Sequence, residues 1–367
     1  MPDNKSDRTA AIVGAGVAGL SCARLLADSG VRVTIFEKSS GPGGRMSTRR
    51  FAATPDKQMH WQCDHGAQYF TARSPAFVDQ VKRWEDAGVV ASWQPELRTI
   101  GRRPDTPAAA SRINHRYVGT PRMTSPARHL ATGLDLISGA RVVAIRHSDQ
   151  GWFLIQENTP APAGPFRDLV LAIPAQQAAD LLGLLTLSSD PCAPATQALT
   201  ACRKHALRPC WALMLNFRHP QSAGDRPDTG FDAVFVNPAT DQNHIVSWIA
   251  RDNSKPGRLP NQGETWVLHA SPEWSQQHLE SDPPLVFDTL LSEFRALTGI
   301  QADVSAHSLH RWRFAQTANT DDSPGDLWLH DIRLGLCGDW LNGGRVEGAW
   351  LSGYQLAQRM LAADRKE

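Results

Sequence analysis

The alternation of hydrophobic and polar positions is clearest near the amino terminus. Ala11–Val13 is a short apolar run, typical of a buried parallel strand. Apolar residues then recur at helical spacing from about Val17 to Asp28, and Gly30 stands where a glycine commonly ends a helix. A second apolar run, Val31–Phe36, predicts another strand. The pattern therefore predicts a strand–helix–strand unit that opens an α/β domain.

The turn between the first strand and the helix contains three glycines in a G-x-G-x-x-G pattern. Gly14 permits a tight turn, Gly16 lets the backbone approach a pyrophosphate, and Gly19 lets the helix pack closely on the strand. Glu37 ends the second strand, where a carboxylate accepts hydrogen bonds from both hydroxyls of a ribose and repels a 2′-phosphate. The unit predicts a dinucleotide site for NAD or FAD.

A second glycine cluster distinguishes between these two cofactors. Gly43-Gly44-Arg45, followed by Ser47 and Thr48, resembles the second glycine motif of FAD-dependent amine oxidases and their relatives. The common form of this motif has an arginine two residues before the glycine pair, where this chain has Gly41. Arg45 can offer charge-assisted hydrogen bonds to the pyrophosphate. The alternative interpretation is a flexible loop that carries a surface arginine.

The stretch 333–358 resembles the carboxyl-terminal flavin motif of the same families. The resemblance implies that Asp339 lies at the ribityl chain or the phosphates, and that the helix beginning near Val346 points its N-terminus at the pyrimidine edge of the flavin, where a positive dipole end stabilises negative charge. Two remote segments thus indicate non-covalently bound FAD. The predicted FAD-binding residues are Gly14, Gly16, Ala18, Gly19, Glu37, Lys38, Gly44, Arg45, Met46, Ala67, Gln68, Val143, Ala172, Pro174, Gly338, Asp339, Val346, Glu347 and Ala349.

Further apolar stretches complete the predicted fold, which is α/β (α+β). Strands at 139–145 and 168–174 are expected beside the adenine and the FAD, in a Rossmann-like FAD-binding domain built from residues 1–85, 125–178 and 305–367. Residues 86–124 and 179–304 are expected to form a substrate domain. Its strand-like stretches, 211–217, 245–250 and 265–269, suggest a β-sheet that covers the flavin.

The segment 64–71, which contains Gly-Ala-Gln-Tyr, is similar to the renalase family of flavoproteins. Further matches at 117–123, 266–274 and 310–315 follow in family order, so the resemblance spans nearly the whole chain. It implies an oxidase of 2- or 6-dihydro isomers of NAD(P)H. Such an enzyme transfers a hydride to flavin N5 and the electrons to O2, and its products are NAD(P)+ and H2O2.

The same resemblance selects candidate catalytic residues. Gln68 and Tyr69 are expected beside the isoalloxazine, and His269 is a candidate contact of the substrate carboxamide, with a core histidine as its alternative. Tryptophans 248, 266 and 274 lie in segments expected above the flavin, although each is as readily a packing residue. For Arg313 the alternative to a flavin contact is a structural ion pair. The predicted catalytic residues are Gln68, Tyr69, Trp248, His269 and Trp312.

Two other functions stay open at this point. A flavin amine oxidase would act on a small amine, and such enzymes often hold a lysine near flavin N5. After Lys82 the chain has only Lys204, Lys255 and Lys366, and none lies in the segment 310–315, which disfavours that function. The other alternative is a flavin-binding redox-sensing module without turnover.

Composition narrows the partners. Lys plus Arg is 38 and Asp plus Glu is 37, so no basic excess suggests a nucleic-acid or membrane partner. The six scattered cysteines, the polar first residues and the lack of a long apolar run lead us to expect a cytoplasmic protein with reduced thiols. His60, Cys63, Asp64 and His65 are metal-binding residue types, but they are crowded and their segment has a flavin-side role, so we expect no metal. The expected partners are a small dihydronicotinamide and O2; the sequence predicts no oligomeric state.

Overall fold

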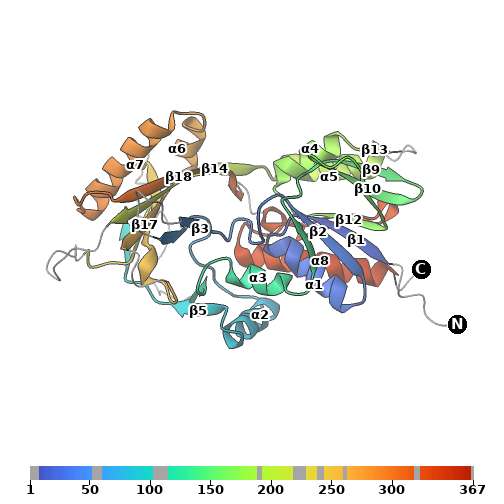
Figure 1. Cartoon of the computed structure of the whole chain (residues 1–367), viewed down its shortest axis with the longest axis horizontal. Coiled ribbons are helices and arrows are strands. Elements are labelled where there is room, and N and C mark those ends of the chain that lie inside the picture. The colour runs from blue at the N-terminus through green and yellow to red at the C-terminus, as the bar shows by residue number, and fades with distance from the viewer. Residues whose placement is uncertain are drawn as a thin grey trace.

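The structure is a computed structural model that describes residues 8–51, 60–101, 115–187, 192–217, 229–237, 244–258, 263–317 and 323–364. One part of the molecule is built around a mostly parallel sheet and the other around an antiparallel sheet (Figure 1). Short elements of the segment 48–131 lie between them (Figure 1). This arrangement confirms the predicted mixed α/β fold.

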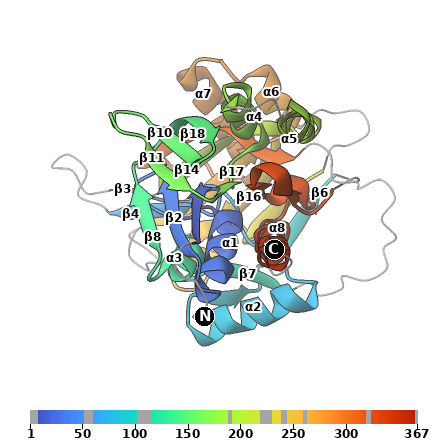
Figure 2. The same ribbon diagram turned by 90° about the vertical axis from the view of Figure 1, so that its right-hand side faces the viewer.

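The parallel sheet contains the predicted strand–helix–strand unit. Helix α1 (Val17–Asp28) connects the central strands β1 and β2, which pair in parallel. Helix α8 (Val346–Asp364) runs beside α1 (Figure 2). The order is β19 (Leu327–Leu329), β20 (Leu334–Leu336), β12 (Asp168–Leu171), β1 (Thr9–Val13), β2 (Arg32–Glu37) and β8 (Asp135–Ser138), with only β19 antiparallel to its neighbour.

A smaller sheet and two helices pack against the other face of these strands. Helices α4 (Ala175–Gly183) and α5 (Cys192–Lys204) share a buried apolar core with this sheet and with strands β1 and β12. Trp152 lies at the centre of that core, fully buried, and its indole N–H donates to the carbonyl of Ile332 at 2.9 Å. The strands are β11 (Ala163–Phe166), β10 (Gly151–Gln156), β9 (Val142–Ser148) and β13 (Thr186–Leu187).

The antiparallel sheet has an apolar layer on each face. Because side chains alternate along a strand, Trp266 and Leu268 of β17 face a core that includes Phe294 of α7, whereas Val267 joins the core of the parallel sheet. Helices α6 (Pro272–Gln277) and α7 (Pro283–Thr298) cover the first of these faces. The order is β18 (Ala306–Thr317), β14 (Leu207–Phe217), β17 (Glu264–Ala270), β16 (Val246–Arg251), β15 (Ala233–Val236) and β6 (Leu97–Ile100), with only β6 parallel to its neighbour.

Two pairs of short strands and two helices lie between the sheets. Strand β3 (Thr48–Phe51) pairs with β4 (Trp61–Asp64), and β5 (Val90–Trp93) pairs with β7 (Arg116–Gly119). Helix α2 (Pro75–Asp86) lies beside α8, and α3 (Ser125–Ala131) packs on α1. Short 3-10 turns occur at 252–254 (η3), 330–332 (η4) and 339–341 (η5).

Strand β18 departs from the predicted domain boundary at residue 305. It pairs with β14 along most of its length and so forms an edge strand of the antiparallel sheet. The domain division as a whole stays a prediction. Within the described ranges, no helix combines the length and the apolar character needed to cross a bilayer. The thiols of Cys22, Cys63, Cys202, Cys210 and Cys337 are buried and free.

Candidate functional site

Glu37 closes the first glycine turn. Its side chain is buried, with Oε2 accepting from the Ala15 N–H and Oε1 from the Ser39 N–H, both at 2.8 Å. Gly14 has φ of +105°, and a Cβ there would lie 2.5 Å from the Ala172 carbonyl oxygen, so no other residue fits. A Cβ at Gly16, in contrast, would meet nothing within 4 Å. The turn is therefore tightly packed underneath and open at Gly16, as a site for a pyrophosphate requires.

The second glycine loop rests on the first. The Gly43 N–H donates to the Ala15 carbonyl at 2.9 Å, and a Cβ at Gly44 would lie 3.3 Å from the Cα of Gly16. The Ala67 N–H in turn donates to the Arg45 carbonyl at 2.9 Å. Three segments that the sequence assigned to FAD thus lie in contact.

Arg45 and Asp339 join the amino-terminal and carboxyl-terminal motifs. Their side chains form a two-pronged ion pair, with one Nη1–Oδ2 distance of 2.9 Å, and Arg45 also donates to the Ala315 carbonyl at 3.0 Å. Asp339 is buried, and the preceding Gly338 N–H donates to Ser352 Oγ on α8 at 3.0 Å. Each of the two predicted phosphate-region groups thus holds the other in position.

Other predicted FAD residues lie around the same turn. The Ala172 N–H donates to the Val13 carbonyl, and the backbone after Ser138 is tied to the end of β2 through the carbonyls of Glu37 and Ser39. Val143, however, is 36% exposed and points its side chain outward, so only its backbone suits the predicted role. Met46 and Ala18 are buried beside the glycine turns. Lys38 directly follows β2, Pro174 directly precedes α4, and Val346 and Ala349 lie in the first turn of α8.

Glu347 has a structural task that the sequence did not indicate. Its Oε1 accepts from the N–H groups of Arg73 (3.0 Å) and Ser74 (2.6 Å), at the beginning of helix α2. One oxygen of this side chain therefore satisfies two backbone donors at the start of another helix. Taken together, the open face at Gly16, the acid at Glu37 and the cation at Arg45 fit FAD.

Gln68 is oriented by a buried cluster of charges. Its Nε2 donates to the carbonyls of Asp64 (2.7 Å) and Gly66 (3.1 Å), and its Oε1 accepts from Lys255 Nζ at 3.0 Å. Both amide hydrogens are used within the protein. The side chain thus fixes the 64–68 segment, and its expected place beside the isoalloxazine stays a prediction.

The cluster consists of Asp64, Asp252, Lys255 and Arg258, whose side chains are all fully buried. Lys255 Nζ lies 3.1 Å from Asp64 Oδ2 and 2.9 Å from Asp252 Oδ1, and Arg258 Nη2 lies 2.5 Å from Asp64 Oδ2. Burial alone would raise the pKa of Asp64, but the two cations hold it well below its usual range. Burial and the Asp64 charge raise the pKa of Asp252. Two acids and two bases make the cluster neutral when all four are ionised, and they couple β4 to the turn after β16.

A second group, the ring cluster, consists of His65, His310 and Trp312. Their ring centroids lie 4.4 to 5.1 Å apart, with His65 stacked on Trp312. The Trp312 indole N–H donates to the His65 carbonyl at 2.9 Å, and His269 Nε2 donates to the same oxygen at 3.2 Å. Trp312 and His269, both predicted from the sequence, therefore converge on the backbone just before Gly66.

The histidines of this region are uncharged at neutral pH. Burial lowers the pKa of His65 to about 3 and the pKa values of His269 and His310 to about 4. Arg49 Nη1 lies 3.3 Å from His310 Nδ1, and since arginine can only donate, that nitrogen must be an acceptor. His65 Nδ1 is buried without a hydrogen-bond partner in the described part of the chain. The ring cluster thus presents flat, neutral surfaces and one free polar atom.

Tyr69 and Trp248 belong to a neighbouring aromatic group. The Tyr69 ring lies 5.7 Å from Trp248 and 6.2 Å from Trp93, and the Arg116 guanidinium stands 5.5 Å above it. Trp248 is also in edge contact with Phe235 at 4.5 Å. The structure therefore brings these two predicted residues together beside Gln68.

Three further candidates make the contacts of their alternative roles, as packing residues or as an ion pair. Trp266 is fully buried in the core on the opposite face of β17, because it lies an odd number of residues from His269. Trp274 stacks on His278 in α6, at 4.2 Å. Arg313 forms an exposed ion pair with Glu280, the alternative already considered for it.

The predicted site residues do not include Lys255, Asp252 and Arg258 of the charge cluster. Their only sequence signal is the D-x-x-K-x-x-R spacing after an apolar strand, which is equally typical of a solvated turn. His65 and His310 could have been predicted as site residues, because both lie within segments that carry the family resemblance.

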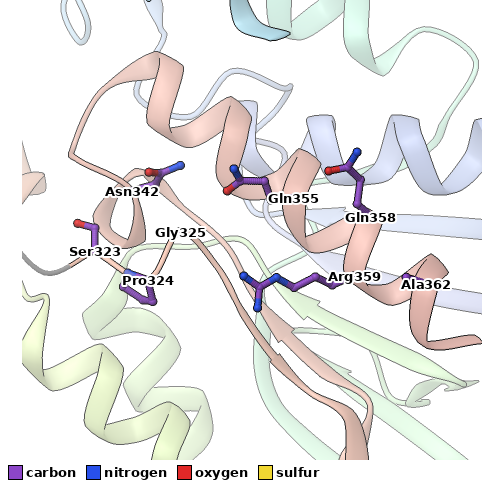
Figure 3. Close-up of a pocket in the computed structure, with 8 residues that line it drawn as sticks. All are labelled: Ser323, Pro324, Gly325, Asn342, Gln355, Gln358, Arg359 and Ala362. Carbon is purple, nitrogen blue, oxygen red and sulfur yellow. The ribbon is translucent and has the colours of Figure 1, made fainter. Parts of the chain in front are cut away.

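A separate hollow of about 590 Å³ lies on the outer face of α8 (Figure 3). Its lining contains none of the predicted site residues, and helix positions 355, 358, 359 and 362 form one stripe away from the contact with α1. It is distinct from the region described above.

Comparison with known proteins identifies the family. The profile of the flavin-containing amine oxidoreductase family matches residues 109–361, and that of the NAD(P)-binding Rossmann-like domain matches residues 12–84. An L-amino-acid oxidase of Siganus canaliculatus is 46% identical over 67 residues, and a carotenoid phi-ring synthase of Streptomyces griseus is 33% identical over 103 residues. These stretches cover 18% and 26% of this chain, but only 12% and 17% of those two proteins.

A solved structure shares the fold over nearly the whole chain. Cyclohexylamine oxidase from Brevibacterium oxydans IH-35A has a TM-score of 0.66 and 12% identity, covering 98% of this chain and 99% of that one. At this identity the likeness concerns the fold alone. The match of the family profile goes further: the chain belongs to the flavin-containing amine oxidoreductase family, and FAD is its cofactor.

Proposed function

We propose that this protein is an FAD-dependent oxidase of 2- and/or 6-dihydro-NAD(P) isomers, as its resemblance to the renalase family implies. Bound FAD would accept the hydride and pass the electrons to O2, so that NAD(P)+ and H2O2 are formed. Membership of the flavin-containing amine oxidoreductase family supports the redox chemistry. The segments 64–71, 266–274 and 310–315 support the substrate class. A cytoplasmic location is part of this proposal.

The ring cluster is the observation that carries the proposal. A dihydronicotinamide becomes aromatic when it loses its hydride, so it needs stacking and orientation rather than an acid or a base. His65, His310 and Trp312 supply flat rings that carry no charge at neutral pH. An ammonium substrate would instead gain from a free carboxylate, and the nearby Asp64 is already paired with two buried cations.

We assign positioning tasks to the other predicted residues. His269 and Trp312 donate to one carbonyl, that of His65, and so fix the backbone that precedes Gly66. Tyr69 and Trp248 supply further ring surface beside that segment. None of these groups has to transfer a proton in the proposed reaction.

A flavin amine oxidase is the second candidate. Lys255 favours it, because a buried lysine lies 3.0 Å from the amide of Gln68, on the segment expected beside the flavin, and this weakens the argument from the scarcity of lysine. Against it, Lys255 Nζ is occupied by three acceptors: Asp64, Asp252 and Gln68.

The test is an oxygen-electrode assay of the purified holoprotein, with H2O2 detected separately. Each dihydro isomer, ordinary NADH and a panel of amines that includes cyclohexylamine serve as substrates. We expect O2 consumption with the isomers, and a raised KM for them in Trp312→Leu. The matched control is Trp274→Leu, which removes a tryptophan of the outer helix α6 that stacks on His278. O2 consumption with amines but not with the isomers would overturn the proposal in favour of the second candidate.

A further inference from the structure

The second glycine motif lacks one of its usual residues. The common form has an arginine two positions before the glycine pair, and this chain has Gly41 there. In the structure, the nearest heavy atom to a Cβ placed on Gly41 is Nη2 of Arg128, 4.0 Å away. The guanidinium of Arg128 therefore lies beside position 41, where the common motif has its arginine, but it belongs to helix α3 and not to the loop.

Helix α3 is held at this place by contacts at both of its ends. At its beginning, the Thr124 side chain packs on the loop, with Cγ2 3.2 Å from where a Cβ of Gly43 would lie. At its end, the Arg24 side chain of α1 donates to the Leu130 carbonyl at 2.9 Å. Arg128 lies between these anchors, so its position beside Gly41 follows from the packing of the helix.

The charge of Arg128 is not compensated. No carboxylate pairs with its exposed side chain in the described ranges, and the same holds for the neighbouring Arg50 and Arg122. Burial, and then the charges of Arg50 and Arg128, lower the pKa of Arg122, as expected where cations gather without counter-ions. Such a group of cations is suited to bind an anion.

The loop beneath Arg128 leads directly to the dinucleotide turn. The Gly43 N–H donates to the Ala15 carbonyl, and Gly44 lies against Gly16, where the backbone is open for a pyrophosphate. When FAD is bound, its doubly charged pyrophosphate is therefore the anion that this loop would approach.

We propose that Arg128 is an FAD-binding residue, and that its guanidinium supplies from α3 the positive charge that the motif arginine would supply from position 41. The partner is a phosphate oxygen of FAD, bound by a charge-assisted hydrogen bond. The inference requires only that FAD is the cofactor and does not depend on which substrate the protein oxidises.

Release of FAD from the holoprotein tests the proposal without any turnover. The holoprotein is diluted, and the rise in flavin fluorescence gives the release rate and the dissociation constant at low and at high salt. Arg128→Met should weaken FAD binding about 10- to 100-fold, the usual cost of losing a charged hydrogen bond, and should flatten the salt dependence. Arg83→Met on α2, which also removes one exposed positive charge, should change neither.

A compensating variant separates binding from a structural task. Gly41 has no positive φ, so Gly41→Arg is sterically possible, and in the Arg128→Met background it should restore most of the lost affinity. The thermal unfolding of the FAD-free protein should be the same for all these variants. Unchanged FAD affinity in Arg128→Met would overturn the proposal. So would an affinity loss that Gly41→Arg does not restore, or one that is matched by destabilisation of the FAD-free protein.

Discussion

Gly353 is the point of closest approach between helices α1 and α8. A Cβ at this position would lie 1.9 Å from the Ala18 carbonyl oxygen and 3.1 Å from the Cys22 nitrogen. An ordinary contact requires 3.4 Å or more, so Gly353→Ala would have to force the helix backbones apart by about 1.5 Å at this point. Because the opposing atoms are backbone, no side-chain rotation can relieve the clash.

The expected cost follows from two opposing terms. Overpacking of this kind costs about 1–3 kcal/mol, and the upper end applies because rigid elements meet. The better helix propensity of alanine offsets up to about 1 kcal/mol. We therefore expect Gly353→Ala to lose about 2 kcal/mol of the free energy of unfolding. Since α8 begins with the predicted flavin contacts Val346–Ala349, the same displacement should also speed the release of FAD.

Urea unfolding of the holoprotein, followed by tryptophan fluorescence, measures this loss. Gly183→Ala is the matched control, because Gly183 ends helix α4 and a Cβ there would meet nothing within 4 Å. The control should be as stable as the wild type or slightly more stable. Equal stability of the two variants would refute the claim that close packing of α1 on α8 holds the site together.

Three further outcomes are expected. Glu37→Gln replaces one carboxylate oxygen by an NH2 group, so one of the two backbone N–H groups that donate to Glu37 loses its acceptor. The affinity for FAD should fall about 10-fold in a fluorescence titration. Glu157→Gln, which changes an exposed ion pair, is the control. Lys255→Met leaves the buried charge cluster with a net negative charge and should lower the free energy of unfolding in urea by about 3–5 kcal/mol. Adding Asp252→Leu to this variant should recover part of the loss. A loss below about 1 kcal/mol would contradict the described burial. Lowering the pH from 7 to 5 should reduce the free energy of unfolding by about 2 kcal/mol through His65 alone, because its pKa of about 3 lies below the unfolded value of 6.5 and only the unfolded chain takes up the proton. His65→Phe should make the free energy of unfolding depend less on pH. An unchanged pH dependence would argue against a buried neutral histidine.

The sequence predicted the FAD cofactor and the fold of the unit that begins its domain. A glycine fingerprint between a strand and an acid has few structural solutions, and the helix predicted over Val17–Asp28 has those bounds in the structure. Arg45 and Asp339 are almost 300 positions apart, yet their proximity could be expected because both motifs were predicted to bind the same cofactor.

The substrate half was predicted less well, for two physical reasons. Successive side chains of a strand lie on opposite faces, and the sequence does not show which face of the sheet is turned toward the cofactor. The strand that contains Trp266 was therefore predicted, but its side chain lies on the face covered by α7. The charge cluster around Lys255 depends on the packing of a turn on a distant strand, and no local pattern encodes such a contact. Gln68 was recognised as important, but its orientation depends on that same cluster.

The most direct test of the proposed reaction is the rate at which the flavin is reduced in the absence of oxygen. The holoprotein is mixed in a stopped-flow instrument with the 2- and 6-dihydro isomers, with ordinary NADH and with amines, and the loss of flavin absorbance is followed. We predict rapid bleaching by at least one isomer, with H2O2 formed when air is admitted, and slow or no bleaching by the amines. Rapid bleaching by an amine, with none by either isomer, would contradict the account.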